Sequence, residues 1–294
     1  MNKVLAIVGP TGVGKTSFSI ECAKKYNGEI ISGDSIQIYR GLNIGSAKIK
    51  EEEKENIKHH LIDIKNPDEN YSVKEFQDLG REKIEELFKN NKLPIIVGGT
   101  GLYIKALLYD YTFFDEDNKD DQFADMSNEE IYKEIELKDP KALLNIHINN
   151  RKRLVRALNI IRKHNKGLSD IKDSQSHKPI YDIKIIGLTK DKEMLLEMVD
   201  KRIDKMIEDG LIEEIKALLN KGISFENQSM QGIGYKEFKE YFEGTKTLDE
   251  CIKEVKTHTH QFIKRQYTWF KNQMNVEWYK DYKDAKESID KWYE

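Results

Sequence analysis

A glycine-rich loop near the N-terminus constrains the fold of this chain more than any other feature. Residues 9–16 read Gly-Pro-Thr-Gly-Val-Gly-Lys-Thr and directly follow an apolar run at residues 4–8. This is the pattern of a phosphate loop between a strand and a helix. Its glycines let backbone N–H groups and a helix N-terminus point at an anion, while Lys15 adds positive charge and the Thr16 hydroxyl reaches a magnesium ion. The sequence therefore predicts a phosphate or pyrophosphate site, and it leaves the reaction open.

Composition narrows the class of protein. The 294 residues suffice for one large domain or for a domain with an insert. The formal net charge is only -3, so contacts with nucleic acid must come from local basic patches. Cys22 and Cys251 lie far apart, which argues against a disulfide scaffold or a zinc site and fits a reducing cytoplasm. With no apolar run near the roughly 18 residues of a membrane span, and a strand predicted at the very N-terminus, we expect a cytoplasmic protein without a membrane partner.

Strand-like and helix-like segments alternate through the first half of the chain. Apolar strands are expected over residues 4–8, 29–32, 93–97 and 181–188, the last of them ending the main sheet. Helices with one apolar face are expected over residues 16–26, 74–90, 195–209, 211–220 and 247–274. Uninterrupted apolar strands between helices indicate a parallel sheet covered on both faces. The predicted fold is therefore α/β, a P-loop NTPase-like parallel sheet flanked by helices.

A change of composition after residue 111 predicts a small helical insertion. Residues 113–121 are acidic and turn-prone, and a helical pattern then runs through Ile131, Ile135 and Leu143. We expect residues 1–111 and 151–294 to form the catalytic core. Residues 112–150 are expected to form the insertion domain.

Polar residues follow two further strands of the predicted sheet. Asp34 follows the second strand, and Thr100 follows the apolar strand at residues 93–97. Because ligands collect outside the carboxyl ends of parallel strands, both should converge on the phosphate loop. Asp34 could serve as a general base, as a magnesium ligand through water, or as a helix cap. The strand before Thr100 ends in Gly-Gly-Thr-Gly and carries no Walker B aspartate, which disfavours a motor ATPase and favours group transfer.

The motifs, taken in order, resemble those of tRNA dimethylallyltransferases, which transfer an isopentenyl-type group to an adenosine beside the anticodon. The resemblance extends over nearly the whole chain. The matching blocks are residues 9–16, 34–40, 59–63, 94–103, 150–158, 202–206, 231–237 and 264–270.

The resemblance implies a reaction and assigns roles to residues. Dimethylallyl pyrophosphate would donate its dimethylallyl group to N6 of the adenosine at position 37 of the tRNA, giving N6-(dimethylallyl)adenosine and pyrophosphate. Asp34 would take the N6 proton, Thr100 would lie near the bridging oxygen of the donor, and Gln37 would read the base edge. The residues expected to bind the pyrophosphate are Thr11, Gly12, Val13, Gly14, Lys15, Thr16 and Arg202, with Mg²⁺ as cofactor on Thr16.

The same resemblance implies a nucleic-acid partner, the anticodon stem-loop of tRNA. The target adenine would be flipped out of its stack into a channel, and the insertion domain would contact the tRNA. The residues expected to bind tRNA are Asp34, Ser35, Ile36, Gln37, Thr100, Arg153, Arg156, Lys264 and Arg265. For the arginines, a solvated helix face is the open alternative. We expect a monomer without an obligate protein partner.

A few positions depart from the family's pattern. His260 stands where the family more often has arginine, so one phosphate contact is expected to be weaker or pH-dependent. Gly232 and Ile36 replace a common alanine and a common methionine without consequence for the chemistry. The zinc-finger tail of eukaryotic relatives is absent, which indicates the bacterial type. The histidine pairs at residues 59–60 and 258–260 are expected to pack and hydrogen-bond, since no third metal ligand is spaced near either.

Two other functions compete with this interpretation. A P-loop small-molecule kinase would use ATP and the same Asp34 as a base for a hydroxyl group. An RNA-binding module with a regulatory phosphate loop would bind RNA equally well after Asp34→Ala and would transfer nothing. The ordered set of motifs favours the transferase.

Overall fold

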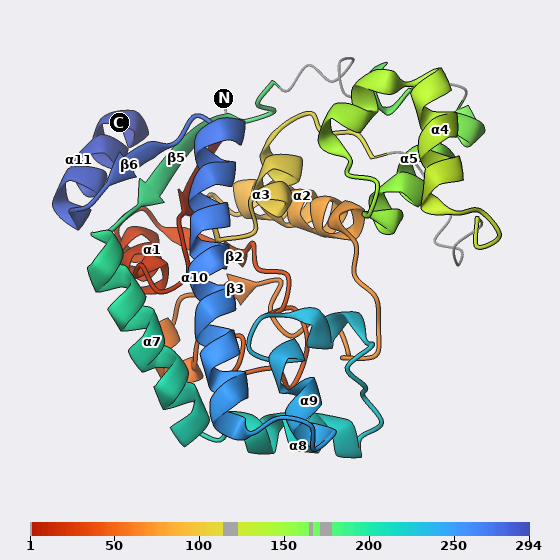
Figure 1. The fold of residues 1–294 in the computed structure, drawn as a ribbon. Helices are drawn as coiled ribbons and strands as arrows, with labels where there is room; N and C mark the ends of the chain where they lie inside the picture. Colours follow the sequence, from red (N-terminus) through yellow and green to blue (C-terminus); the bar gives the residue numbers. More distant parts are fainter. Residues whose placement is uncertain (1, 114–122, 165–166, 171–177) are drawn as a thin grey trace. The chain divides into compact units, whose positions relative to one another are not determined.

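The computed structural model describes residues 2–113, 123–164, 167–170 and 178–294. The chain divides into two compact units (Figure 1). The first unit comprises Met1–Tyr109 and Pro179–Glu294, and the second comprises Asp110–Lys178. In the described part of the chain, no helix is both long and apolar enough to cross a bilayer.

The first unit is built on a six-stranded sheet in the order β3-β2-β4-β1-β5-β6, and every neighbouring pair is parallel. Its strands are β1 (Lys3–Val8), β2 (Gly28–Ser32), β3 (His59–His60), β4 (Leu93–Gly98), β5 (Asp182–Leu188) and β6 (Glu277–Tyr279). The predicted α/β class is confirmed. The expectation that residues 181–188 form the last strand is wrong, because β6 adds an edge beyond β5. Strands as short as β3 and β6 show no usable periodicity.

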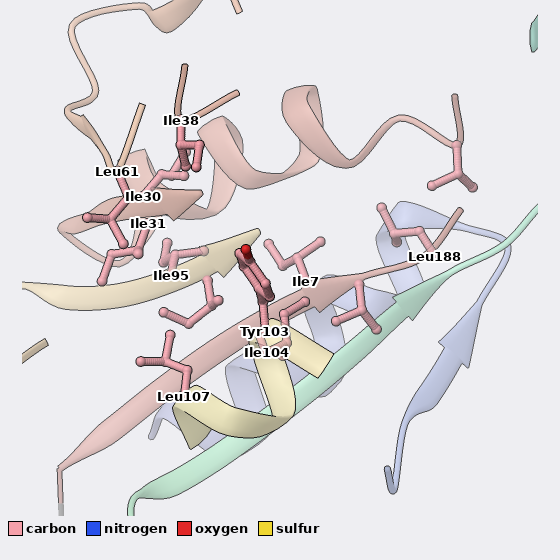
Figure 2. Packing of buried hydrophobic residues seen from close by; sticks show 14 of the residues in the cluster. Ile7, Ile30, Ile31, Ile38, Leu61, Ile95, Tyr103, Ile104, Leu107 and Leu188 are labelled. Carbon is pink, nitrogen blue, oxygen red and sulfur yellow. The ribbon is translucent and has the colours of Figure 1, made fainter. Parts of the chain in front are cut away.

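The strands are buried on both faces, as their apolar sequences require. Residues 4–8 of β1 have no exposed surface at all. Figure 2 shows side chains of helix α3 (Gly101–Leu108) packed against the central strands, among them Tyr103 and Ile104 of the helix with Ile7 and Ile95 of the strands. This burial fixes the carboxyl ends of β1, β2 and β4, and therefore the loops that follow them.

Helices cover the sheet and supply the walls of the site. Besides α3 they are α1 (Lys15–Lys25), α2 (Val73–Lys89), α7 (Lys192–Glu208), α8 (Leu211–Asn220), α9 (Lys239–Phe242), α10 (Leu248–Gln273) and α11 (Tyr282–Tyr293). Short 3₁₀ turns lie at Glu51–Lys54, Gln228–Gln231 and Lys236–Phe238. A capping box between Thr247 and Glu250 starts α10. The long helix α10 runs beside α7 (Figure 1), where His260 pairs with Asp200 at 2.7 Å.

The second unit is helical, with α4 (Asn128–Lys138), a 3₁₀ turn (Pro140–Asn145) and α5 (Arg151–His164). Its separate core includes Ile131, Ile135, Leu154 and Leu158. The unit therefore runs beyond the expected boundary at residue 150, and α5, which we expected in the catalytic core, belongs to it. The cause is the apolar face of α5, which is buried against α4. The acidic segment at residues 114–121 lies outside the described residues.

Candidate active site

Loops from three neighbouring strands converge on one cavity with a volume of about 820 Å³. The phosphate loop after β1, the segment after β2 and the Gly-Gly-Thr-Gly segment after β4 form its base, and α7 and α10 form walls. Lys15, Asp34, Thr100 and Arg202 all line it. The convergence expected from the carboxyl ends of parallel strands is thus present.

Lys15 places a positive charge in the mouth of the phosphate loop. Its Nζ donates hydrogen bonds to the carbonyl oxygens of Gly9 (2.9 Å) and Pro10 (2.8 Å). The pKa of this ammonium is lowered to about 8, chiefly by burial and then by the neighbouring Arg202 guanidinium, while the Asp34 carboxylate acts in the opposite direction. The ammonium is therefore charged but poorly solvated. A bound anion would replace the stabilisation of its charge that burial removes together with the surrounding water.

Arg202 brings a second cation to the cavity from α7. Burial lowers the pKa of its guanidinium, and the carboxylates of Asp34 and Glu53 oppose that shift. Arginine stays charged even so, because its ordinary pKa is far above neutrality. Two partly desolvated cations facing one cavity, with Asp34 beside them, form a site suited to a multiply charged anion.

The Asp34 carboxylate stabilises the turn that follows β2. Its Oδ1 accepts hydrogen bonds from the backbone N–H groups of Ile36 (2.8 Å) and Gln37 (3.3 Å), which is an Asx turn. The expected helix cap is therefore wrong, because no helix begins here and this oxygen stabilises a turn instead. The hydrogen bonds that the structure describes for Asp34 all go to Oδ1, so Oδ2 is left to accept a proton from a ligand in the cavity.

The carboxamide of Gln37 lines the cavity but is held by its own surroundings. Its Nε2 donates to the carbonyl oxygens of Ser46 (3.2 Å) and Ala47 (3.4 Å), and its Oε1 accepts from the Ser32 hydroxyl at 3.4 Å. These bonds fix the orientation of the amide. Gln37 is therefore held in one orientation at the cavity wall.

Glu214 supports this part of the wall, a role that the sequence did not reveal. Its carboxylate accepts from the backbone N–H groups of Asn43 and Ile44, both at 2.8 Å, and from the Tyr235 hydroxyl at 2.7 Å. The loop so anchored continues to the carbonyl groups that hold Gln37. The only signal in the sequence was the position of Tyr235 within the block at residues 231–237.

Gln266 of α10 connects two of the converging loops. Its Oε1 accepts from the backbone N–H of Thr11 (3.2 Å) and its Nε2 donates to the carbonyl oxygen of Gly99 (3.1 Å). The residue is only 5% exposed. A Cβ at Gly99 would overlap Gln266, and one at Gly101 would overlap Trp269, so both glycines that flank Thr100 are required by the close approach of α10. Sequence analysis placed Gln266 in a motif without giving it a role.

Comparison with known proteins identifies the family. Residues 37–273 match the model of the IPP transferase family. The chain belongs to this family. A curated relative, the tRNA dimethylallyltransferase of Bacillus pumilus, is 47% identical over 97% of this chain and 93% of its own length. The resemblance inferred from the motifs is thereby confirmed.

Solved structures of IPP transferases show the same fold. The tRNA isopentenylpyrophosphate transferase of Bacillus halodurans matches with a TM-score of 0.76 and 40% identity, covering 100% of this chain and 96% of its own. A eukaryotic dimethylallyltransferase described as acting on tRNA matches with a TM-score of 0.84 and 30% identity, covering 96% of this chain and 75% of its own. The predicted P-loop NTPase-like fold is confirmed by these neighbours.

The other residues expected in the site of this IPP transferase differ in their placement. Those lining the cavity are Thr11, Gly12, Gly14, Thr16, Ser35, Ile36 and Arg265. Val13 is buried in the core, so only its backbone can face an anion. Lys264 is exposed on α10 and is not part of the cavity lining. Arg153 and Arg156 are exposed on α5 in the second unit, as a solvated basic face requires.

A magnesium ion would find few protein ligands here. In the part of the chain that the structure describes, no group of three or more His, Cys, Asp or Glu side chains could hold a metal ion. Mg²⁺ needs no such cage, since it keeps several waters and binds substrate phosphates with one or two protein oxygens. The Thr16 hydroxyl, which lies at the cavity, fits that requirement.

Three of the four histidines that could suggest a metal site face a carboxylate, and His59 Nδ1 contacts the carbonyl oxygen of Ile57. His60 Nε2 lies 2.7 Å from Glu29 Oε2, and His258 Nδ1 lies 2.9 Å from Glu237 Oε1. His260, at the position where arginine is more common, contacts Asp200 of α7. Its role in this IPP transferase is thus to join α10 to α7, the helix that carries Arg202.

Proposed function

We propose that this IPP transferase moves a dimethylallyl group from dimethylallyl pyrophosphate to N6 of the adenosine at position 37 of tRNA, beside the anticodon. The observation that carries the proposal is the meeting of Lys15, Arg202, Asp34 and Thr100 in one cavity. The names of the relatives support the same reaction. A prenyltransferase needs a site that binds the pyrophosphate, an apolar surface for the prenyl chain and a base for the acceptor. The cavity offers residues suited to each of these three tasks.

The phosphate loop is the proposed site of the donor's pyrophosphate. The allylic C–O bond breaks with its electron pair staying on the pyrophosphate, so the leaving group gains charge that Lys15 and Arg202 stabilise. Mg²⁺ on Thr16 would neutralise more of that charge. Thr100 caps α3 through its backbone with no side-chain cap bond, so its hydroxyl can bind the bridging oxygen.

The apolar part of the cavity suits the five-carbon chain and the purine ring. The apolar residues that line it include Ile36, Met198, Ile203, Met206, Val255 and Phe262. An adenine N6 is a poor nucleophile because its lone pair is delocalised into the ring. As the N6–C bond forms, one N6 proton passes to the Asp34 carboxylate, which makes the acceptor competent.

The proposed nucleic-acid partner is the anticodon stem-loop of tRNA. An adenine can reach the Asp34 carboxylate in the cavity only when it is flipped out of its stack. Arg265 at the cavity wall and the exposed Lys264 would contact RNA phosphates. Arg153 and Arg156 of the insertion are also proposed to bind tRNA. We further propose that the protein acts in the cytoplasm as a monomer.

The kinase alternative is not favoured. Strand β4 ends in Gly-Gly-Thr-Gly where a P-loop kinase or ATPase usually has a magnesium-binding aspartate. The experiment is to follow pyrophosphate release by the purified protein with tRNA, Mg²⁺ and dimethylallyl pyrophosphate, without ATP. Release that requires tRNA supports the proposal. ATP consumption with a small acceptor, and no tRNA-dependent release, would replace it with the kinase.

A further inference from the structure

The last helix of the chain makes a hydrogen bond onto the phosphate loop. The hydroxyl of Tyr282, the first residue of α11, donates to the carbonyl oxygen of Gly14 at 2.8 Å. Its ring packs on Phe18 of α1 with ring centroids 4.9 Å apart. Gly14 has φ +99, and a Cβ there would overlap the Tyr282 hydroxyl. This glycine is therefore needed both for its backbone conformation and for the approach of Tyr282.

We propose that Tyr282 is a positioning residue that aims the backbone N–H of Lys15 at the bound pyrophosphate. In a trans peptide the C=O of Gly14 and the N–H of Lys15 point in opposite directions. Holding the carbonyl from the side of α11 thus turns the N–H toward the cavity, which Gly14 and Lys15 line and Tyr282 does not. The inference rests on the proposed function of this cavity and adds a residue far from it in sequence.

Local bonds alone leave this peptide less well held. Gly14 O also accepts from the Ser17 hydroxyl at 3.1 Å and from the Phe18 N–H at 3.4 Å. Both donors belong to the first turn of α1 and move with it. The shorter bond from Tyr282 comes from α11, so it connects the phosphate loop to an element outside α1. The N–H of Lys15, as the first in its helix, has no acceptor within that helix and remains available to an anion.

Helix α11 is bonded to the sheet as well as to α1, since Ser288 Oγ donates to Glu277 of β6 at 2.9 Å and Trp292 Nε1 donates to Asp182 of β5 at 3.0 Å. Asp290 accepts from Lys25 Nζ and from the Tyr26 hydroxyl, both at 2.7 Å. The Tyr293 hydroxyl donates to the carbonyl oxygen of Tyr26 at 3.3 Å. Tyr282 therefore sits at the phosphate end of α1 and Tyr293 at its opposite end. The two tyrosines make the same kind of bond, and only one of them touches the loop.

The test compares Tyr282→Phe with Tyr293→Phe as a matched control. Each variant loses one hydroxyl-to-carbonyl bond between α11 and α1 and keeps its ring. The probe is inorganic pyrophosphate with Mg²⁺, and the readout is the Kd from titration calorimetry. We expect Tyr282→Phe to bind about three- to tenfold more weakly, and Tyr293→Phe to bind like the wild type. In turnover, Tyr282→Phe should raise KM for the donor and leave KM for tRNA unchanged, with Tm shifts alike in both variants.

Three outcomes would overturn the inference. A Kd within twofold of the wild type for Tyr282→Phe shows that the loop does not need this bond. Equal weakening in both variants shows that α11 acts only through general stability. Wild-type protein that binds no pyrophosphate would remove the proposed donor site and this inference together, whereas normal wild-type binding with an unaffected Tyr282→Phe removes the inference alone.

Discussion

Replacing Asp34 by asparagine separates its two roles. Asparagine keeps an Oδ1 that can accept the N–H groups of Ile36 and Gln37, and it loses the proton-accepting carboxylate. Removing a general base costs about 100- to 10,000-fold in rate, which is about 3–5 kcal/mol of transition-state free energy. Asp34→Asn should therefore lose kcat by that factor while its free energy of unfolding stays near that of the wild type.

Alanine at the same position should add a structural cost. Asp34→Ala gives up both hydrogen bonds of the turn, each contributing about 0.5–1.5 kcal/mol. We expect a lower free energy of unfolding by about 1–3 kcal/mol, on top of the same loss in kcat. Comparing the two variants by thermal unfolding and by single-turnover transfer to tRNA resolves the base from the turn.

Donor binding supplies the control. The Asp34 carboxylate favours the charged form of Lys15 and also repels an anion, so neither variant should weaken binding of dimethylallyl pyrophosphate greatly. If Asp34→Asn keeps kcat within tenfold of the wild type, Asp34 is not the base. If it instead loses donor affinity while turnover of the bound complex is normal, the residue acts in binding and the assignment is wrong.

Three further predictions concern charge and packing around the cavity. The pKa of Lys15 is lowered to about 8 in the free protein, and a bound anion raises it. The affinity for dimethylallyl pyrophosphate should therefore fall as pH rises above 8, as measured by titration from pH 7 to 10. An affinity that does not change over this range would contradict the prediction. Gln266→Met should lower kcat and cost about 1–3 kcal/mol in unfolding free energy by orphaning buried groups, whereas Gln273→Met on the exposed end of α10 should do neither; equal effects would refute the role of Gln266. In steady-state transfer assays, Glu214→Gln should raise KM for tRNA and leave KM for the donor unchanged. A rise in the donor KM alone would contradict the proposal that Glu214 supports the loop that holds Gln37.

The sequence predicted the centre of the fold and of the site, because both depend on local patterns. Buried parallel strands are recognisable in the sequence as apolar runs, and their carboxyl ends lie at one edge of the sheet. The convergence of Lys15, Asp34 and Thr100 could therefore be predicted from the sequence alone. Arg202, which was inferred through a family motif, lines the same cavity. The helix cap considered for Asp34 was wrong, because the chain makes a turn there and not a helix.

What the sequence missed depends on long-range contacts. Gln266 bonds to Thr11 and Tyr282 to Gly14, more than 250 residues away in each case. No periodicity or spacing carries such a pairing. The boundary at residue 150 was misplaced for a related reason: only the buried contacts of α5 with α4 assign this helix to the insertion.

The most direct test of the account is mass spectrometry of nucleosides from tRNA incubated with the purified protein, Mg²⁺ and dimethylallyl pyrophosphate. The account predicts a five-carbon addition on N6 of the adenosine directly 3′ of the anticodon. It also predicts that Asp34→Asn abolishes the addition on the time scale of wild-type turnover. An unmodified adenosine, or a prenyl group on another atom or nucleoside, would contradict it.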